Sequence, residues 1–161
     1  MGCGKSSVGR KLSELLCCPF TDLDAVIEQQ TGRTIPEIFS TEGESGFRKR
    51  ELEALCNIIG SEDSERVLSL GGGTITQDKC AEIIKEKTTC IYLRASMDTL
   101  VERLSDEASG RPLLQSTDIR TRIETLMGQR SHKYESVAHH IIDTDGHSIE
   151  EVALSIIELL R

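Results

Sequence analysis

The sequence predicts an α/β protein with three layers, in which helices cover both faces of a parallel sheet. Short apolar segments alternate with helical patterns along the chain, which is typical of parallel strands joined by right-handed crossovers. Segments such as 67–70 and 90–93 are apolar throughout, as expected for strands that are buried on both faces. Acidic residues and glycines directly follow such segments, at the sheet edge where parallel sheets bind ligands.

The first third of the chain is predicted to contain a helix, a strand and two further helices. Apolar residues at helical spacing indicate a helix over 5–16. Residues 19–24 are expected to form a strand and 25–30 a helix, which Gly32 terminates. Thr34 then begins a short helix, because Glu37 three positions later completes a capping box.

The rest of the chain continues the alternation. A long helix is predicted over 44–59 from its apolar face. The remaining strands are predicted over 67–70, 90–93 and 140–143. The remaining helices are predicted over 77–87, 97–104, 118–134 and 148–160. Residues 105–116 are polar and contain glycine and proline, so we expect a loop there.

Composition and charge indicate one domain, at 1–161, with no nucleic-acid or membrane partner. The 37% hydrophobic content is sufficient for a core of Leu, Ile and Val. The net charge of −8 argues against binding to nucleic acid or an anionic membrane, which requires a basic face. No apolar run is long enough to span a bilayer and no signal-peptide pattern is present, so we expect a cytoplasmic protein.

The cysteines indicate a reducing compartment. They form no C-x-x-C pair, and no histidine cluster accompanies them at zinc-site spacing. We expect most of the six to be buried as small hydrophobic side chains. They are Cys3, Cys17, Cys18, Cys56, Cys80 and Cys90.

Residues 2–7, Gly-Cys-Gly-Lys-Ser-Ser, match the second half of the phosphate-loop pattern G-x-x-x-x-G-K-[ST]. Glycines in such a loop let backbone N–H groups surround a phosphate, while the lysine reaches the outer phosphates and the hydroxyl reaches Mg²⁺. The helix that follows would place the phosphates at its N-terminus, where its dipole favours negative charge. The alternative interpretation is an ordinary turn before a helix.

Two strand ends carry candidate site residues. Asp22 and Asp24 are two positions apart, so on a strand their side chains would point to the same side. They could instead be a helix N-cap followed by a surface charge. Three consecutive glycines, 71–73, suggest close approach of a ligand to the backbone, with a flexible loop as the alternative.

Six motifs together resemble those of shikimate kinases, over essentially the whole chain. They are Gly2-x-Gly4-Lys5-Ser6, Asp22-x-Asp24, G-E-x-x-F-R at 43–48, Gly71-Gly72-Gly73, Arg111-Pro112-Leu113-Leu114 and Arg130-x3-Tyr134. The resemblance implies transfer of the γ-phosphoryl group of ATP to the 3-hydroxyl of shikimate, a step in aromatic amino-acid biosynthesis. It also implies Mg²⁺ as cofactor, a monomer, and the P-loop kinase fold of nucleoside monophosphate kinases with a five-stranded parallel sheet.

The resemblance also implies a role for each motif residue. The catalytic residues would be Lys5, Asp24 and Arg111. ATP would be bound by Gly2, Cys3, Gly4, Lys5, Ser6, Ser7 and Arg111. Shikimate would be bound by Asp24, Arg48, Gly71, Gly72, Gly73 and Arg130. Ser6 would ligate Mg²⁺ directly, and Asp22 through water.

Within these roles, Arg48 and Arg130 would clamp the substrate carboxylate, since a guanidinium matches a carboxylate bidentately. The helices at about 24–60 would bind the substrate, and 105–116 would close as a lid that carries Arg111. Without the motif context each arginine would be read as a solvated surface side chain. Tyr134 is expected to pack rather than to act.

The chain departs from the family pattern in three places. His132 stands where the family commonly has proline, and Asp106 with Glu107 makes the lid acidic, which leaves Arg103 as the nearest basic candidate to stack on adenine. The first loop glycine and the central first strand would precede Met1. We therefore expect a slot between neighbouring strands, and a sequence that starts at an internal methionine.

Two other functions remain open from the sequence. A gluconate kinase-like enzyme of the same fold would also use Arg48 and Arg130, because gluconate is a carboxylate too. A truncated, catalytically inactive domain is the second alternative.

Overall fold

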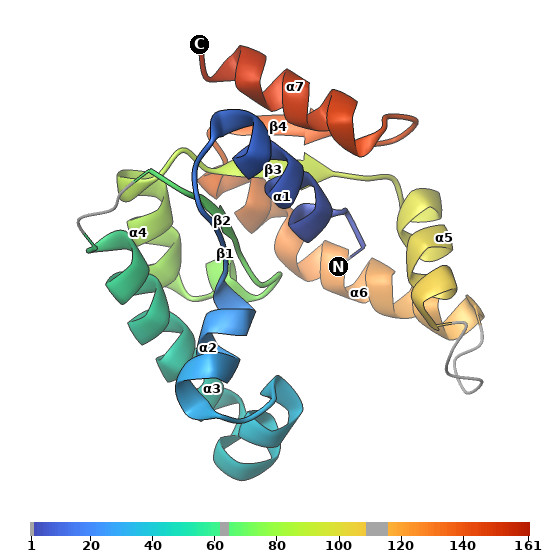
Figure 1. The fold of residues 1–161 in the computed structure, drawn as a ribbon. Helices are drawn as coiled ribbons and strands as arrows, with labels where there is room; N and C mark the ends of the chain where they lie inside the picture. The colour runs from blue at the N-terminus through green and yellow to red at the C-terminus, as the bar shows by residue number, and fades with distance from the viewer. Residues whose placement is uncertain (1, 62–64, 109–115) are drawn as a thin grey trace.

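The computed structural model describes residues 2–61, 65–108 and 116–161. Helices and strands alternate as the sequence predicts (Figure 1). The elements are α1 (Lys5–Leu16), β1 (Phe20–Asp22), α2 (Leu23–Thr31), α3 (Ile35–Ile59), β2 (Val67–Ser69), the 3₁₀-helix η1 (Thr74–Thr76), α4 (Asp78–Lys87), β3 (Ile91–Arg94), α5 (Met97–Ala108), α6 (Ser116–Val137), β4 (His140–Asp143) and α7 (Ile149–Leu159).

All strand pairs in the described residues are parallel, which confirms the predicted sheet type. β1 pairs with β2, and Thr21 lies opposite Leu68. β3 pairs with β4, and Tyr92 lies opposite Ile141. The two pairs form separate two-stranded sheets. The slot that the sequence predicts between neighbouring strands therefore corresponds to the break between β2 and β3. α1 and α7 pack together against β3. Figure 1 shows α7 above β3 and β4 and α6 below them.

Three groups of buried side chains hold these layers together. The largest joins α2, α3, η1, α4 and the end of α6, with Leu23, Ile38 and Leu55 fully buried. The second joins α1 and α7 to β3, and the third joins α5 to α6. The phosphate-loop segment therefore leads into one core, whereas the segments around Asp24 and Arg48 belong to another.

Local signals fix the helices that approach the site. Thr34 and Glu37 form the predicted capping box at the start of α3. Gly43 interrupts α3 with φ of 69°, a backbone conformation open to glycine, so the predicted short and long helices meet there at a kink. Gly32 ends α2 with φ of 63°, as predicted.

Some expectations fail. Only Cys80 among the six cysteines is fully buried, and Cys17 and Cys56 are exposed, because they lie on outward positions of helix ends and faces rather than in the cores. Residues 105–108 continue α5, so the predicted loop start at 105 is wrong. None of the helices in the described part of the chain is long and apolar enough to cross a membrane.

Candidate active site

The phosphate-loop segment leads into α1 through a left-handed glycine. Gly4 is the N-cap of α1 with φ of 82°, which L-residues with side chains rarely adopt. Among the described residues no side chain caps this helix end, so its first-turn N–H groups remain available to an anion. Lys5 begins the helix, and its Nζ lies 3.7 Å from Cys3 Sγ.

Ser6 and Asp22 place two oxygen donors side by side. Ser6 Oγ donates a hydrogen bond of 3.2 Å to Asp22 Oδ2. The other carboxylate oxygen, Oδ1, accepts from the backbone N–H groups of Asp24 (3.1 Å) and Ala25 (3.3 Å), so it caps α2. The described residues contain no cluster of three or more His, Cys, Asp or Glu for a metal. A hydroxyl with one carboxylate nevertheless suits Mg²⁺, which in kinases takes most of its ligands from phosphates and water.

Asp24 lies in the first turn of α2, not on the strand. The prediction that both acidic side chains project to one side of a strand is therefore wrong, because the Asp22 cap ends β1 and starts the helix immediately. The N-cap alternative is correct for Asp22. Burial is the largest factor that raises the pKa of Asp24, followed by the negative charges of Asp22 and Glu51, while Lys5 opposes the shift.

Arg48 is held by a buried carboxylate one turn further along α3. Its Nη1 donates a hydrogen bond of 2.6 Å to Glu51 Oε2, and the side chains are only 18% and 1% exposed. A Cβ atom at Gly73 would lie 2.4 Å from Nη2 of Arg48, far inside contact distance. The guanidinium thus packs directly on residues 71–73, the glycine segment, and a side chain at Gly73 would displace it from this position.

Glu51 also anchors the segment that follows the glycines. It accepts hydrogen bonds from Thr74 Oγ1 at 2.5 Å and from Gln77 Nε2 at 2.9 Å. Sequence reasoning missed all three residues. The spacing of Arg48 and Glu51 along a helix was a visible signal for their ion pair, but the contacts to Thr74 and Gln77 span more than twenty positions.

The glycine segment is bordered by two further site residues. A Cβ atom at Gly71 would lie 3.1 Å from Asp24 Oδ1. Tyr134 Oη donates a hydrogen bond of 2.5 Å to the Gly72 carbonyl. Tyr134 also packs against Tyr92, with ring centroids 5.2 Å apart, so the predicted packing role is correct but incomplete.

Arg130 lies on α6, one turn before Tyr134, and is half-buried. Within the described residues its side chain forms no ion pair or hydrogen bond. Residues four apart share a helix face, so Arg130 and Tyr134 are neighbours on α6. Arg111 lies outside the described residues. Arg103 donates a hydrogen bond of 3.3 Å to the Gly2 carbonyl, which places it at the phosphate-loop segment.

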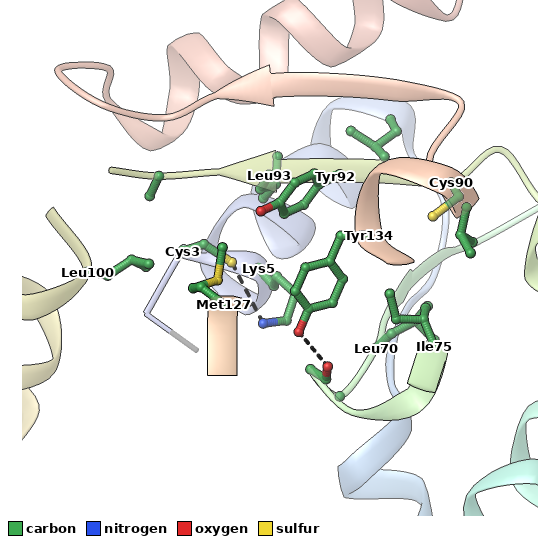
Figure 2. A pocket seen from close by; sticks show the side chains of 15 residues that line it. Cys3, Lys5, Leu70, Ile75, Cys90, Tyr92, Leu93, Leu100, Met127 and Tyr134 are labelled. Atoms are coloured by element: carbon green, nitrogen blue, oxygen red, sulfur yellow. Dashed lines mark hydrogen bonds between the residues drawn. The ribbon is translucent and has the colours of Figure 1, made fainter. Parts of the chain in front are cut away.

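A cavity of about 110 Å³ lies between the two sheets. In Figure 2, Lys5 of α1 and Tyr134 of α6 both line it, with Tyr92 above them in the view. Gly71 and Gly72 form part of the same wall. The structure therefore brings Lys5, the glycine segment, Asp24 and Arg48 into one connected region through shared contacts.

Known proteins resemble the chain over its full length. The Shikimate kinase family model matches residues 1–161. A shikimate kinase of Marinomonas sp. is 38% identical over 161 residues, which cover 100% of this chain and 88% of that protein. One from Thermus thermophilus is 41% identical over 160 residues, with coverage of 99% and 85%.

Solved structures agree with this match. A shikimate kinase from Acinetobacter baumannii in complex with shikimate has a TM-score of 0.84 and 38% identity, and the match covers 99% of this chain and 88% of that chain. One from Bacteroides thetaiotaomicron has a TM-score of 0.88 and 28% identity, with coverage of 99% and 93%. The phosphate-loop segment, the half-buried Arg48 and the glycine segment thus occur in a chain that belongs to the shikimate kinase family.

Proposed function

We propose that the chain transfers the γ-phosphoryl group of ATP to the 3-hydroxyl of shikimate, as a step in aromatic amino-acid biosynthesis. One observation carries the proposal beyond the family match. Asp24, Arg48 and the glycine segment form a contiguous surface whose electrostatics include Lys5 of the phosphate-loop segment. A kinase needs its acceptor hydroxyl and the phosphoryl donor next to each other, because phosphoryl transfer depends chiefly on positioning and on charge stabilisation.

Residues 2–7 supply the donor side of this site. The uncapped first turn of α1 offers backbone N–H groups to phosphate oxygens, and Gly4 lets the loop turn into the helix. Lys5 brings a positive charge to the oxygens on which charge develops during transfer. Arg103, beside the Gly2 carbonyl, adds a second cation to this region.

Mg²⁺ would be held by Ser6 directly and by Asp22 through water, consistent with their 3.2 Å separation. When bound, the ion neutralises charge on the phosphate oxygens and fixes their orientation. Asp22 is suited to this position because only one of its oxygens is used to cap α2.

Asp24 and the two arginines supply the acceptor side. Asp24 accepts the proton of the attacking hydroxyl, or a hydrogen bond from it, and its raised pKa brings it closer to the range useful for a base. Arg48 binds the substrate carboxylate, pre-oriented by Glu51. Arg130 completes the clamp, and its charge is uncommitted to other described residues. Arg111 would act from the lid.

The proposal also covers the setting in which the enzyme works. We expect a monomer in the cytoplasm. Sedimentation of the purified protein at assay concentration tests the first expectation. A dimer that loses activity on dilution would contradict it.

An assay of ADP release tests the substrate. Purified protein with ATP and Mg²⁺ receives either shikimate or gluconate. We expect kcat/KM for shikimate to exceed that for gluconate by about 100-fold or more, because sites built to hydrogen-bond specific hydroxyls discriminate strongly. Equal turnover of both acids would contradict the assigned substrate. If no ADP is released with either shikimate or gluconate, the result would support the inactive-domain alternative instead.

A further inference from the structure

Helix α6 is hydrogen-bonded at two points to the stretch from Gly72 to Asp78, which begins within the glycine segment. Tyr134 Oη donates a hydrogen bond of 2.5 Å to the Gly72 carbonyl, as the dashed line in Figure 2 marks. The adjacent Lys133 donates to the Thr76 carbonyl at 3.0 Å and to Asp78 Oδ1 at 2.8 Å. Both side chains therefore form hydrogen bonds to the segment that runs from the end of β2 to the start of α4.

The same segment is also in contact with Arg48. A Cβ atom at Gly73 would clash with the Arg48 guanidinium in its present position. The glycine segment thus contacts both Arg48 of α3 and helix α6, which carries Arg130. It links the helices that bear the two guanidinium groups, in addition to the apolar core that α3 and the end of α6 share.

We infer that Tyr134 is a positioning residue, whose hydroxyl sets the placement of Arg130 relative to Arg48 through the Gly72 carbonyl. This inference rests on the proposed function, because it assumes that both arginines bind the substrate carboxylate. A carboxylate is held bidentately only when donors reach it from the correct directions, so a small shift of α6 weakens binding without disturbing the phosphate-loop segment.

We expect the Tyr134 hydroxyl to hold α6 against this segment more strongly than Lys133 does. Asp78 is 88% exposed, and ion pairs in such solvated positions contribute little. The Tyr134–Gly72 hydrogen bond is short and lies at the wall of the cavity, where lost hydrogen bonds are less easily replaced by water. The Tyr134 ring packs on Tyr92 independently of its hydroxyl, so the two contributions can be separated by mutation.

The substitution Tyr134→Phe removes the hydroxyl and keeps the ring. We expect KM for shikimate to rise about fivefold to tenfold, the loss typical of one hydrogen bond, while KM for ATP changes by less than about twofold. Tyr92→Phe is the matched control, because Tyr92 lines the same cavity and its hydroxyl makes no hydrogen bond to other described residues. It should leave both KM values unchanged.

A double-mutant cycle with Arg130→Ala tests whether Tyr134 acts through Arg130. If it does, Tyr134→Phe should raise KM for shikimate by less than about twofold once Arg130 is gone, because the two effects are then non-additive. An undiminished effect in the Arg130→Ala background would overturn the inference. So would equal changes in the KM values for ATP and shikimate.

Stability measurements test whether Tyr134 has a purely structural role, and binding measurements test its role independently of turnover. Both tyrosine variants should melt within about 4 °C of the wild type, and a much larger fall for Tyr134→Phe alone would show a structural role and overturn the inference. Calorimetric titration with shikimate repeats the cycle without turnover. A wild type that binds shikimate but does not phosphorylate it would therefore refute the proposed function separately, whereas the cycle in binding affinities would still decide the role of Tyr134.

Discussion

Glu51 is a buried carboxylate, only 1% exposed, that faces Arg48, Thr74 and Gln77 at hydrogen-bond distance. Burying a charge is costly unless it is paired and hydrogen-bonded, and Glu51 meets both conditions. The same contacts hold the Arg48 guanidinium against Gly73. A single side chain thus stabilises the fold and orients a proposed substrate-binding group.

The substitution Glu51→Gln should weaken both properties. It keeps the shape of the side chain but leaves Arg48 with only the exposed Glu44 as a charged partner, so we expect the free energy of unfolding to fall by about 1–3 kcal/mol. KM for shikimate should rise with it. Urea unfolding and initial rates measure the two effects. Glu53→Gln on the same helix is the control, because Glu53 is 61% exposed and should change little. Equal behaviour of the two variants would contradict the role given to Glu51.

Asp24, unlike Glu51, is expected to serve activity while it lowers stability. Its folded pKa is raised from the ordinary value of 3.8, chiefly by burial, so folding favours the protonated form. The stability contributed by Asp24 is fully present below the unfolded pKa and is lost as pH rises through the folded pKa. At neutral pH the charged carboxylate therefore destabilises the fold.

Asp24→Asn should accordingly stabilise the protein at about pH 7, and this gain should shrink as pH falls toward the ordinary aspartate pKa. The same variant should lose about 100-fold or more in kcat if Asp24 is the base. Urea unfolding across the pH range and initial rates measure these effects. A stability gain that grows on acidification would contradict the stated environment of Asp24.

At the scale of elements, two glycines should respond oppositely to alanine. Gly43 breaks α3 with φ of 69° and ψ of −176°, where a side chain is strained, so Gly43→Ala should lower the free energy of unfolding by about 1–3 kcal/mol. Gly128 lies inside α6, and an added methyl group would meet nothing within 4 Å. Gly128→Ala should therefore stabilise the protein by about 0.5–1 kcal/mol. Thermal unfolding of both variants compares them, and the same sign for both would contradict the kink.

Local signals were sufficient to predict most elements from the sequence. The bounds of α1 agree with prediction, and the capping box of α3 forms as expected, because both depend on residues only a few positions apart. The assignment of Asp24 to a strand failed because an N-cap converts strand to helix within one residue. A periodicity argument cannot resolve so short a transition.

The site was only partly predictable for a related reason. Phosphate-loop residues and Arg48 were found because each stands in a short motif. The contacts of Glu51 with Thr74 and of Tyr134 with Gly72 join distant elements, and they depend on how helices pack rather than on sequence spacing. The burial of cysteines was overestimated for the same reason, since residue type alone does not say which helix face is covered.

At the scale of the whole molecule, the site is assembled from two cores. The phosphate-loop segment leads into the core of α1, β3 and α7, whereas Asp24, Arg48 and Gly73 lie on or next to α2, α3 and η1, which contribute to the largest core. The cavity between the sheets lies where these halves meet. Donor and acceptor functions should therefore be separable by mutation, since each half holds its own residues.

The most direct test of this division is a titration of shikimate at saturating ATP with two variants, Lys5→Met and Arg48→Lys. Lys5→Met should lower kcat by about 100-fold and leave KM for shikimate nearly unchanged, because the lysine acts on transferring charge. Arg48→Lys should raise KM for shikimate by about tenfold or more, because an ammonium cannot replace a bidentate guanidinium. A normal KM in Arg48→Lys, or an unchanged kcat in Lys5→Met, would contradict the central claim that these two halves form one shikimate-phosphorylating site.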